Sequence, residues 1–220
     1  MRDVAEALGL NLATTYHLVN TLVHEGYVAR SPERGLVAGP RLAARTAPGL
    51  APAPVRRALG KAAYAVGDVA VLCSVRHGEA FVTAAEEVPG APCGGRYLVG
   101  SRHLPHLSAA GRVILAADRS GAGLRDAQRA AGASGMPFER AVLEEELERV
   151  RRRGSAVVEA ETEACVGAPV LDARGAVVGA VALVVTPRVL RRNEPELVAT
   201  VRHAAASVSR SLASDPAAAA

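Results

Sequence analysis

The chain has 220 residues, half of them hydrophobic, so it is long enough for two globular domains with cores of their own. Its 26 Lys and Arg residues outnumber its 22 Asp and Glu residues, and the formal charge of +4 permits an anionic partner without requiring one. Three scattered cysteines without a C-x-x-C pair indicate neither a disulfide framework nor a zinc finger. No signal peptide or bilayer-spanning apolar run is found, so we expect a cytoplasmic protein with no membrane anchor.

The first part of the chain has the pattern of a helix-turn-helix. Gly9 separates two segments with helical spacing, because glycine readily adopts the conformation in which a helix ends and the chain turns. The second segment is expected to be a helix over residues 11–25. Its apolar side contains Thr15, Leu18, Val19 and Leu22. In such a unit the second helix enters the DNA major groove, with its N-terminal residues closest to the base edges.

A wing is expected directly after this helix. Residues 27–30 alternate like a strand, residues 31–35 are typical of a turn, and residues 36–38 can return as a second strand. Together these elements predict a winged helix-turn-helix DNA-binding domain over residues 1–42. The residues expected to contact DNA are Asn11, Leu12, Ala13, Thr14, Thr15, Tyr16, His17, Asn20 and Arg34.

Prolines and glycines in residues 43–54 disfavour a continuous helix and predict an interdomain linker. A second domain is expected over residues 55–213, followed by a disordered tail at 214–220. Its strands and helices predict an α+β fold. In chain order we expect a helix at 55–66, a hairpin of strands at 69–75 and 80–84, a strand at 93–99, a helix at 109–117 capped by Ser108, a helix at 139–153, strands at 156–159, 166–171 and 177–185, and a helix at 195–212; residues 119–136 stay unassigned.

Four segments in this order resemble the IclR family of bacterial transcriptional regulators. They are GLNLATTYHLVNTLVHEGYVAR at 9–30, GSRHLPHLSAAGRVILA at 100–116, LEEELERVRRRG at 143–154 and CVGAPVLDARGAVVGAVAL at 165–183. The resemblance covers nearly the whole chain. It implies a winged helix-turn-helix joined to a GAF-like effector-binding domain, acting as a homodimer or dimer of dimers on double-stranded operator DNA, with a small-molecule effector in the second domain and no cofactor.

The same resemblance implies where the effector binds. The family pocket is lined by the loop and helix start matching residues 107–111, by the position of Cys165, and by the strand matching residues 183–185. Some members carry serines on that strand that bind a carboxylate. Since Leu183 and Val185 offer no donor, we expect a fairly apolar effector. The residues carried over are Leu107, Ser108, Ala110, Gly111, Glu159, Cys165, Leu183 and Val185.

The chain also departs from the family pattern in its first domain. Family members usually carry another helix before the one that begins here, so the apolar residues of this domain are expected to lack one wall. Leu12, Ala13 and His17 stand where the family often has Lys or Arg, Ser, and Arg. Because phosphate contacts supply most non-specific affinity, we expect weaker DNA binding.

Two other site types remain as alternatives. His103 and His106 with Cys93 or Cys165 could ligate zinc, although their spacing frames a Leu-Pro turn and favours surface histidines. Cys165 could be the nucleophile of a hydrolase, but no base or catalytic motif accompanies it, so we expect no enzyme. The main alternative to a DNA-binding regulator is a ligand-binding protein whose truncated winged helix-turn-helix domain no longer binds DNA.

Overall fold

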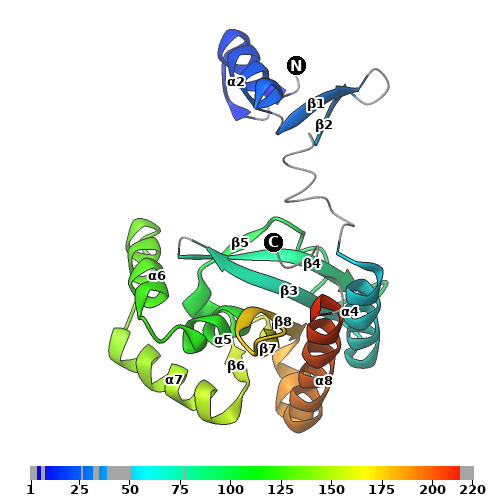
Figure 1. The fold of residues 1–220 in the computed structure, drawn as a ribbon, viewed down its shortest axis with the longest axis vertical. Helices are drawn as coiled ribbons and strands as arrows, with labels where there is room; N and C mark the ends of the chain where they lie inside the picture. The colour runs from blue at the N-terminus through cyan, green and yellow to red at the C-terminus, as the bar shows by residue number, and fades with distance from the viewer. Residues whose placement is uncertain are drawn as a thin grey trace. The chain divides into compact units, whose positions relative to one another are not determined.

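The chain forms two compact units, residues 1–50 and 51–220 (Figure 1). The structure, a computed structural model, describes residues 4–5, 8–25, 27–31, 35–38, 51–76 and 78–213. Most of the expected linker and the whole expected tail, residues 214–220, lie outside this part of the chain. Within it, no helix combines the length and apolar character needed to cross a membrane.

The first unit contains the expected helix and wing. Gly9 has a φ of +62°, and the helix that follows it, α2, spans Leu12–His24. Strands β1 (Val28–Ser31) and β2 (Gly35–Ala38) pair antiparallel and form the wing. The winged helix-turn-helix prediction is therefore confirmed.

The apolar side of α2 is only partly buried. Thr15 and Val19 are covered, whereas the side chains of Leu18 and Leu22 are 47% and 41% exposed. Among the described residues of this unit, Leu8 is also exposed. The exposure of these leucines agrees with the expectation that the apolar residues of this domain lack one wall.

The second unit is built on one six-stranded sheet with the order β5-β4-β3-β8-β7-β6. Each neighbouring pair of strands is antiparallel. The expected hairpin is confirmed as β3 and β4. The strands are β3 (Val69–Arg76), β4 (Glu79–Glu87), β5 (Arg102–His103), β6 (Ala156–Glu159), β7 (Ala164–Leu171) and β8 (Val177–Val185).

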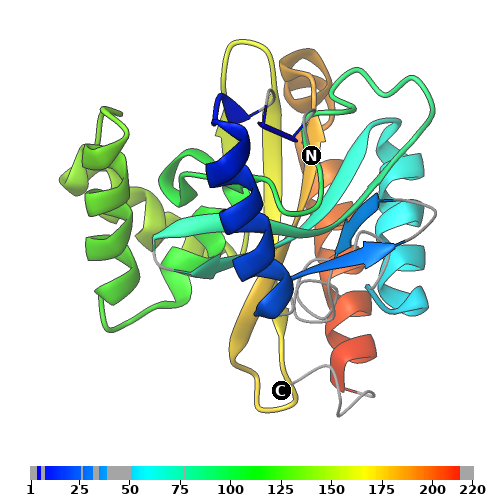
Figure 2. The ribbon, with the colours of Figure 1, turned by 90° about the horizontal axis from the view of Figure 1, so that it is seen from above.

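Helices cover both faces of this sheet, as Figure 2 shows. One face packs against α4 (Ala53–Val66) and α8 (Pro187–Ala213). The other face packs against α5 (Ala109–Ala117), α6 (Ala122–Ala133) and α7 (Arg140–Arg153), with a short 3-10 helix, η1 (Pro105–Leu107), before α5. The backbone of α8 bends at Asn193, just before Pro195, because proline cannot continue the hydrogen-bonding pattern of a helix. The expected α+β class is confirmed.

Two apolar cores lie on the two faces of the sheet, and strand alternation assigns residues to them. Cys165 pairs with Val184, and both face α5. Val166 pairs with Leu183, and both face α4 and α8. Because successive residues of a strand point to opposite faces, a shift of one position changes the core to which a residue belongs.

Several elements of the second unit differ from the sequence-based expectation, which does not include β5 or η1. The expected strand at 93–99 is wrong, because these residues form turns held by hydrogen bonds to side chains. The Cys93 N–H donates to Oδ1 of Asp68 at 2.9 Å, and the Gly95 N–H donates to Oε2 of Glu87 at 2.9 Å. Helix α6 lies in the unassigned stretch, and α8 begins at Pro187, although its part after the bend at Asn193 matches the expected helix at 195–212.

Candidate functional site

The start of α2 is fixed by two side chains that the sequence analysis assigned to DNA contact. Oδ1 of Asn11 accepts the Thr14 N–H at 2.8 Å, so Asn11 is the N-cap of the helix. The Thr15 side chain is 1% exposed, and its hydroxyl donates to the Asn11 carbonyl at 3.0 Å. Thr15 therefore faces the interior, which corrects its assignment as a DNA contact.

The opposite side of α2 is exposed. Ala13, Tyr16, His17 and Asn20 lie at helical spacing on that side, and all four are solvent-accessible. Leu12 and Thr14 are exposed beside them. Arg34 lies outside the described residues. The helix thus presents a surface with one phenol, one imidazole and one amide.

On the α5 face of the second unit, the start of α5 packs closely against the sheet. Ser108 is the N-cap, and its Oγ accepts the Gly111 N–H at 3.1 Å, as its position in the sequence predicts. A Cβ added at Gly167 of β7 would lie 2.8 Å from the carbonyl carbon of Ala109. Ala110 is buried in the same place. Small residues therefore bring the helix start next to the strand that carries Cys165.

Cys165 is covered by Tyr97 and Glu163, two residues that are not among the sequence-based predictions. The Tyr97 hydroxyl donates to Oε1 of Glu163 at 2.5 Å and lies 4.0 Å from the Cys165 Sγ. Arg96 reaches Oε2 of Glu163 at 3.4 Å. The Tyr97 ring lies beside the His103 ring, with 5.2 Å between the centroids. Glu163 stands two residues before Cys165, a spacing that could have indicated it, but nothing local to Tyr97 indicates its position.

The environment of Cys165 keeps its thiol protonated. Burial and, to a smaller extent, the nearby Glu163 carboxylate together raise the pKa of Cys165 to about 12, although the hydrogen bond with Tyr97 partly opposes this. Burial also raises the pKa of the Tyr97 phenol. A catalytic thiol needs a lowered pKa, so this environment does not support the hydrolase alternative.

Three of the eight expected effector residues lie on the opposite face of the sheet. Leu183 and Val185 are fully buried under α4 and α8. Glu159 forms an ion pair with Arg191 of α8. The alternation of β8 places Val184, not its two neighbours, on the side of Cys165. The structure therefore brings together Ser108, Ala110, Gly111 and Cys165, but not Glu159, Leu183 or Val185.

The remaining predicted positions differ in burial. Leu107 is 46% exposed in η1. His106 is only 6% exposed, which corrects the expectation that it lies at the surface, and His103 is half-buried. Among the described residues, no group of three or more His, Cys, Asp or Glu side chains could hold a metal ion.

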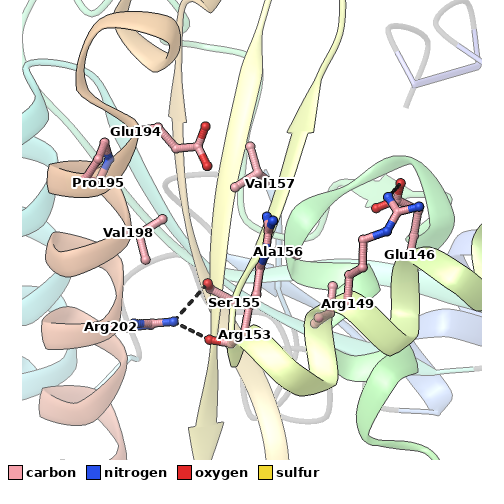
Figure 3. Close-up of a pocket in the computed structure, with 11 residues that line it drawn as sticks. Glu146, Arg149, Arg153, Ser155, Ala156, Val157, Glu194, Pro195, Val198 and Arg202 are labelled. Carbon is pink, nitrogen blue, oxygen red and sulfur yellow. Dashed lines mark hydrogen bonds and ion pairs between the residues drawn. The ribbon is translucent and has the colours of Figure 1, made fainter.

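A separate cleft of about 420 Å³ lies between α7, β6 and α8 (Figure 3). Arg202 of α8 reaches across it, donating to the Arg153 carbonyl and, at 3.3 Å, to Oγ of Ser155. Arg149 pairs with Glu146 on the α7 side. Two of its arginines are thus engaged within the protein, and none of the expected effector residues lines this cleft.

Comparison with known proteins settles the class to which this architecture belongs. The family profile of the bacterial transcriptional regulator IclR C-terminal domain matches residues 95–210, which is more than half of the chain. The profile of the IclR helix-turn-helix domain matches residues 1–32. The chain belongs to the IclR family of bacterial transcriptional regulators. It combines a helix-turn-helix unit with a C-terminal effector domain, in a family of regulators and not of enzymes.

Solved structures support the same fold. The IclR transcriptional regulator from Alicyclobacillus acidocaldarius is 25% identical, with 95% of this chain and 88% of that chain covered and a TM-score of 0.69. The Thermotoga maritima IclR is 20% identical, with 96% and 90% covered and a TM-score of 0.65. The Agobacterium tumefaciens repressor BlcR is also 20% identical, with 96% and 88% covered and a TM-score of 0.57. A search of curated proteins gave no match.

Proposed function

We propose that this IclR-family regulator binds operator DNA through the exposed side of α2 and responds to a small effector held on the α5 face of its second unit. The observation that carries the DNA-binding part is that α2 has one buried side and one exposed side. Thr15 and Val19 are buried, whereas Tyr16, His17 and Asn20 face solvent on a helix that a wing follows. A two-helix unit of this kind presents such a side to the major groove.

The chemistry around Cys165 supports a fairly apolar effector. Val184 and Ala110 provide apolar walls near this thiol, and neither side chain has a hydrogen-bond donor. Tyr97 and Glu163 form the polar part of the surroundings. A carboxylate in the ligand would meet the negative charge of Glu163, so a neutral or cationic ligand with an apolar body fits better.

DNA binding is tested by titrating the full chain against DNA from upstream of its own gene at several salt concentrations. Since a helix-turn-helix regulator acting as a homodimer reads two half-sites, we expect preference for a palindromic or pseudo-palindromic site and a steep fall of affinity with salt. Tyr16→Ala with Asn20→Ala should remove the preference. The matched control is Tyr64→Ala, at a tyrosine of α4 that is 82% exposed. If the affinity for DNA depended only weakly on salt and showed no sequence preference, the alternative would be supported: a ligand-binding protein whose first unit no longer binds DNA.

The effector site is tested by two substitutions at neighbouring positions. Val184→Thr adds a hydroxyl on the α5 face, and Val185→Thr adds the same hydroxyl on the α4 and α8 face. Both residues are fully buried, so the two substitutions should cost similar stability. Only Val184→Thr should change which compounds raise the melting temperature in a panel of neutral and anionic aromatics. If Val185→Thr changed the panel equally, the effector would not lie on the α5 face.

A further inference from the structure

A second cleft lies between α4 and α8, on the face of the sheet opposite Cys165. The two helices run side by side there (Figures 1 and 2), and the cleft has a volume of about 680 Å³. Small-molecule sites typically measure about 300–1,000 Å³. The size of the cleft therefore suits a ligand of several tens of atoms at most.

The ionisable side chains that line this cleft are all of basic residues. Arg57 and Lys61 line it from successive turns of α4, and His203 lines it from α8. Of the residues that the structure describes, no acidic one lines it. In the part of the chain that the structure describes, none of these three side chains forms an ion pair or hydrogen bond. Elsewhere on the same unit arginines do find carboxylates, as Arg191 does with Glu159.

Its other lining groups are small apolar side chains and hydroxyls. Alanines of both helices, such as Ala62 and Ala204, are buried at its base. Thr200 stands three residues before His203 and Ser207 four residues after it, so both lie on the same side of α8 and add hydroxyl groups. An apolar base with a few convergent polar groups is the usual composition of a ligand site.

We propose that this cleft binds a small organic anion with an apolar body. The carboxylate or phosphate head lies between Arg57 and Lys61 on one side and His203 on the other, and the body rests on the alanines. Such a ligand would neutralise two adjacent cations that have no ion-pair partner in the described part of the chain. Because α4 is the first helix after the segment that joins the two units, binding would restrain α4 against α8.

The proposal is tested by calorimetric titration of the full chain with four probes. These are 2-naphthoate, 2-naphthyl phosphate, inorganic phosphate and the neutral 2-naphthalenemethanol. We expect one or both naphthyl anions to bind on the order of tenfold more tightly than the alcohol and than inorganic phosphate, and the better of the two identifies the head group. Equal binding of the alcohol would overturn the requirement for an anion, and equal binding of inorganic phosphate would overturn the requirement for an apolar body.

Two charge-reversal variants locate the binding. Arg57→Glu with Lys61→Glu should weaken binding of the naphthyl anion about tenfold or more. The matched control, Arg56→Glu with Arg192→Glu, makes the same change of charge at exposed positions of the same two helices that do not line the cleft, and should leave the affinity within about twofold. The melting temperature of each variant checks that it folds. If Arg57→Glu with Lys61→Glu does not fold, the milder pair Arg57→Gln with Lys61→Gln is used in its place. If both charge-reversal variants lost affinity equally, or neither did, the anion would bind elsewhere and the proposal would be wrong.

Discussion

The Tyr97 hydroxyl donates a 2.5 Å hydrogen bond to Oε1 of Glu163, and this pair covers Cys165. Tyr97 comes from a segment without regular secondary structure, whereas Glu163 stands directly before β7. Access to the thiol from this side therefore depends on a loop and one hydrogen bond. Loops are less restrained than the strands beneath them, so this loop is the part of the α5 face best suited to open for a ligand.

Removing the Tyr97 ring should make Cys165 reactive. In Tyr97→Ala the thiol loses its cover, and its pKa should fall from about 12 towards its ordinary value. We expect its reaction with a disulfide reagent at pH 8 to accelerate by about tenfold or more. Tyr97→Phe keeps the cover without the hydroxyl and should change the rate much less. In the double variant Tyr97→Ala/Cys165→Ser the accelerated reaction should disappear, which would assign it to the Cys165 thiol. An unchanged rate in Tyr97→Ala would show that Tyr97 does not control access to this thiol.

Gly111→Ala and Gly60→Ala should have opposite effects on stability. Both glycines lie within helices, but a Cβ at Gly111 would be 2.3 Å from the Pro105 carbonyl oxygen, whereas a Cβ at Gly60 would have no heavy atom within 4 Å. We expect Gly111→Ala to cost about 1–3 kcal/mol, because η1 and α5 must move apart. Gly60→Ala should gain about 0.5–1 kcal/mol. Urea unfolding measures both, and equal effects would contradict the close contact at Pro105.

His106 should make the second unit sensitive to mild acid. Neither ring nitrogen has a hydrogen-bond partner among the described residues, and the ring packs edge-on against Phe138, with 4.9 Å between centroids. Burial lowers the pKa of His106, the Pro137 carbonyl, which lies nearby but outside hydrogen-bonding geometry, partly opposes this, and the Arg112 charge lowers the pKa further. Because the folded pKa lies below the ordinary 6.5, the unfolded chain takes up the proton first, and stability is lost as the pH falls below about 6.5.

Two substitutions of His106 separate titration from polar burial. His106→Phe keeps the aromatic contact with Phe138, so it should raise stability at pH 7 by about 1 kcal/mol and flatten the loss of stability between pH 6.5 and 5. His106→Gln should also flatten the loss of stability in acid, but it should not raise stability at pH 7, because it leaves a polar group buried. Urea unfolding at each pH measures both, and an unchanged acid slope in both variants would show that His106 is not the titrating group.

The sequence predicts structure well at positions where the structure depends on residues that are close in the sequence. Ser108 caps α5 as expected because an N-cap depends on residues within one turn, and β8 has the expected bounds because an apolar run is easily seen. The same run, VVGAVALVV, offers no pattern that could correct the assignment of Leu183 and Val185 to the effector site, which rests on the family resemblance. Both faces of this central strand are buried, so its sequence does not alternate and does not indicate which residues face α5.

The polar cover of Cys165 could not be predicted for a different reason. Tyr97 and Glu163 are 66 positions apart, and their contact depends on how a loop crosses the sheet. The short run Tyr97-Leu98-Val99 favours a strand over residues 93–99, whereas the Cys93 N–H donates to the Asp68 side chain in a turn. Side-chain contacts between distant segments override local propensity in such places.

Asn11 offers a test of whether the N-cap of α2 also reads DNA. Its Oδ1 accepts the Thr14 N–H, so Asn11→Ala should destabilise α2 by about 1 kcal/mol, whereas Asn11→Asp keeps the cap and favours the positive end of the helix dipole.

The two variants therefore separate capping from DNA contact at Asn11. If Asn11 acts only as a cap, Asn11→Asp should preserve the helix signal in circular dichroism and the sequence preference for DNA, with weaker overall affinity from the added negative charge, whereas Asn11→Ala should reduce the helix signal. If Asn11 also contacts a base, Asn11→Asp should lose the sequence preference while keeping the helix, because a carboxylate cannot donate the hydrogen bonds of an amide. The contact of Asn11 with Thr14 uses its oxygen, which leaves the NH₂ group as the donor in question, so we expect Asn11→Asp to keep its helix and lose part of its preference between DNA sites. Titration of each variant against a specific and a scrambled site, beside its circular dichroism spectrum, measures both quantities.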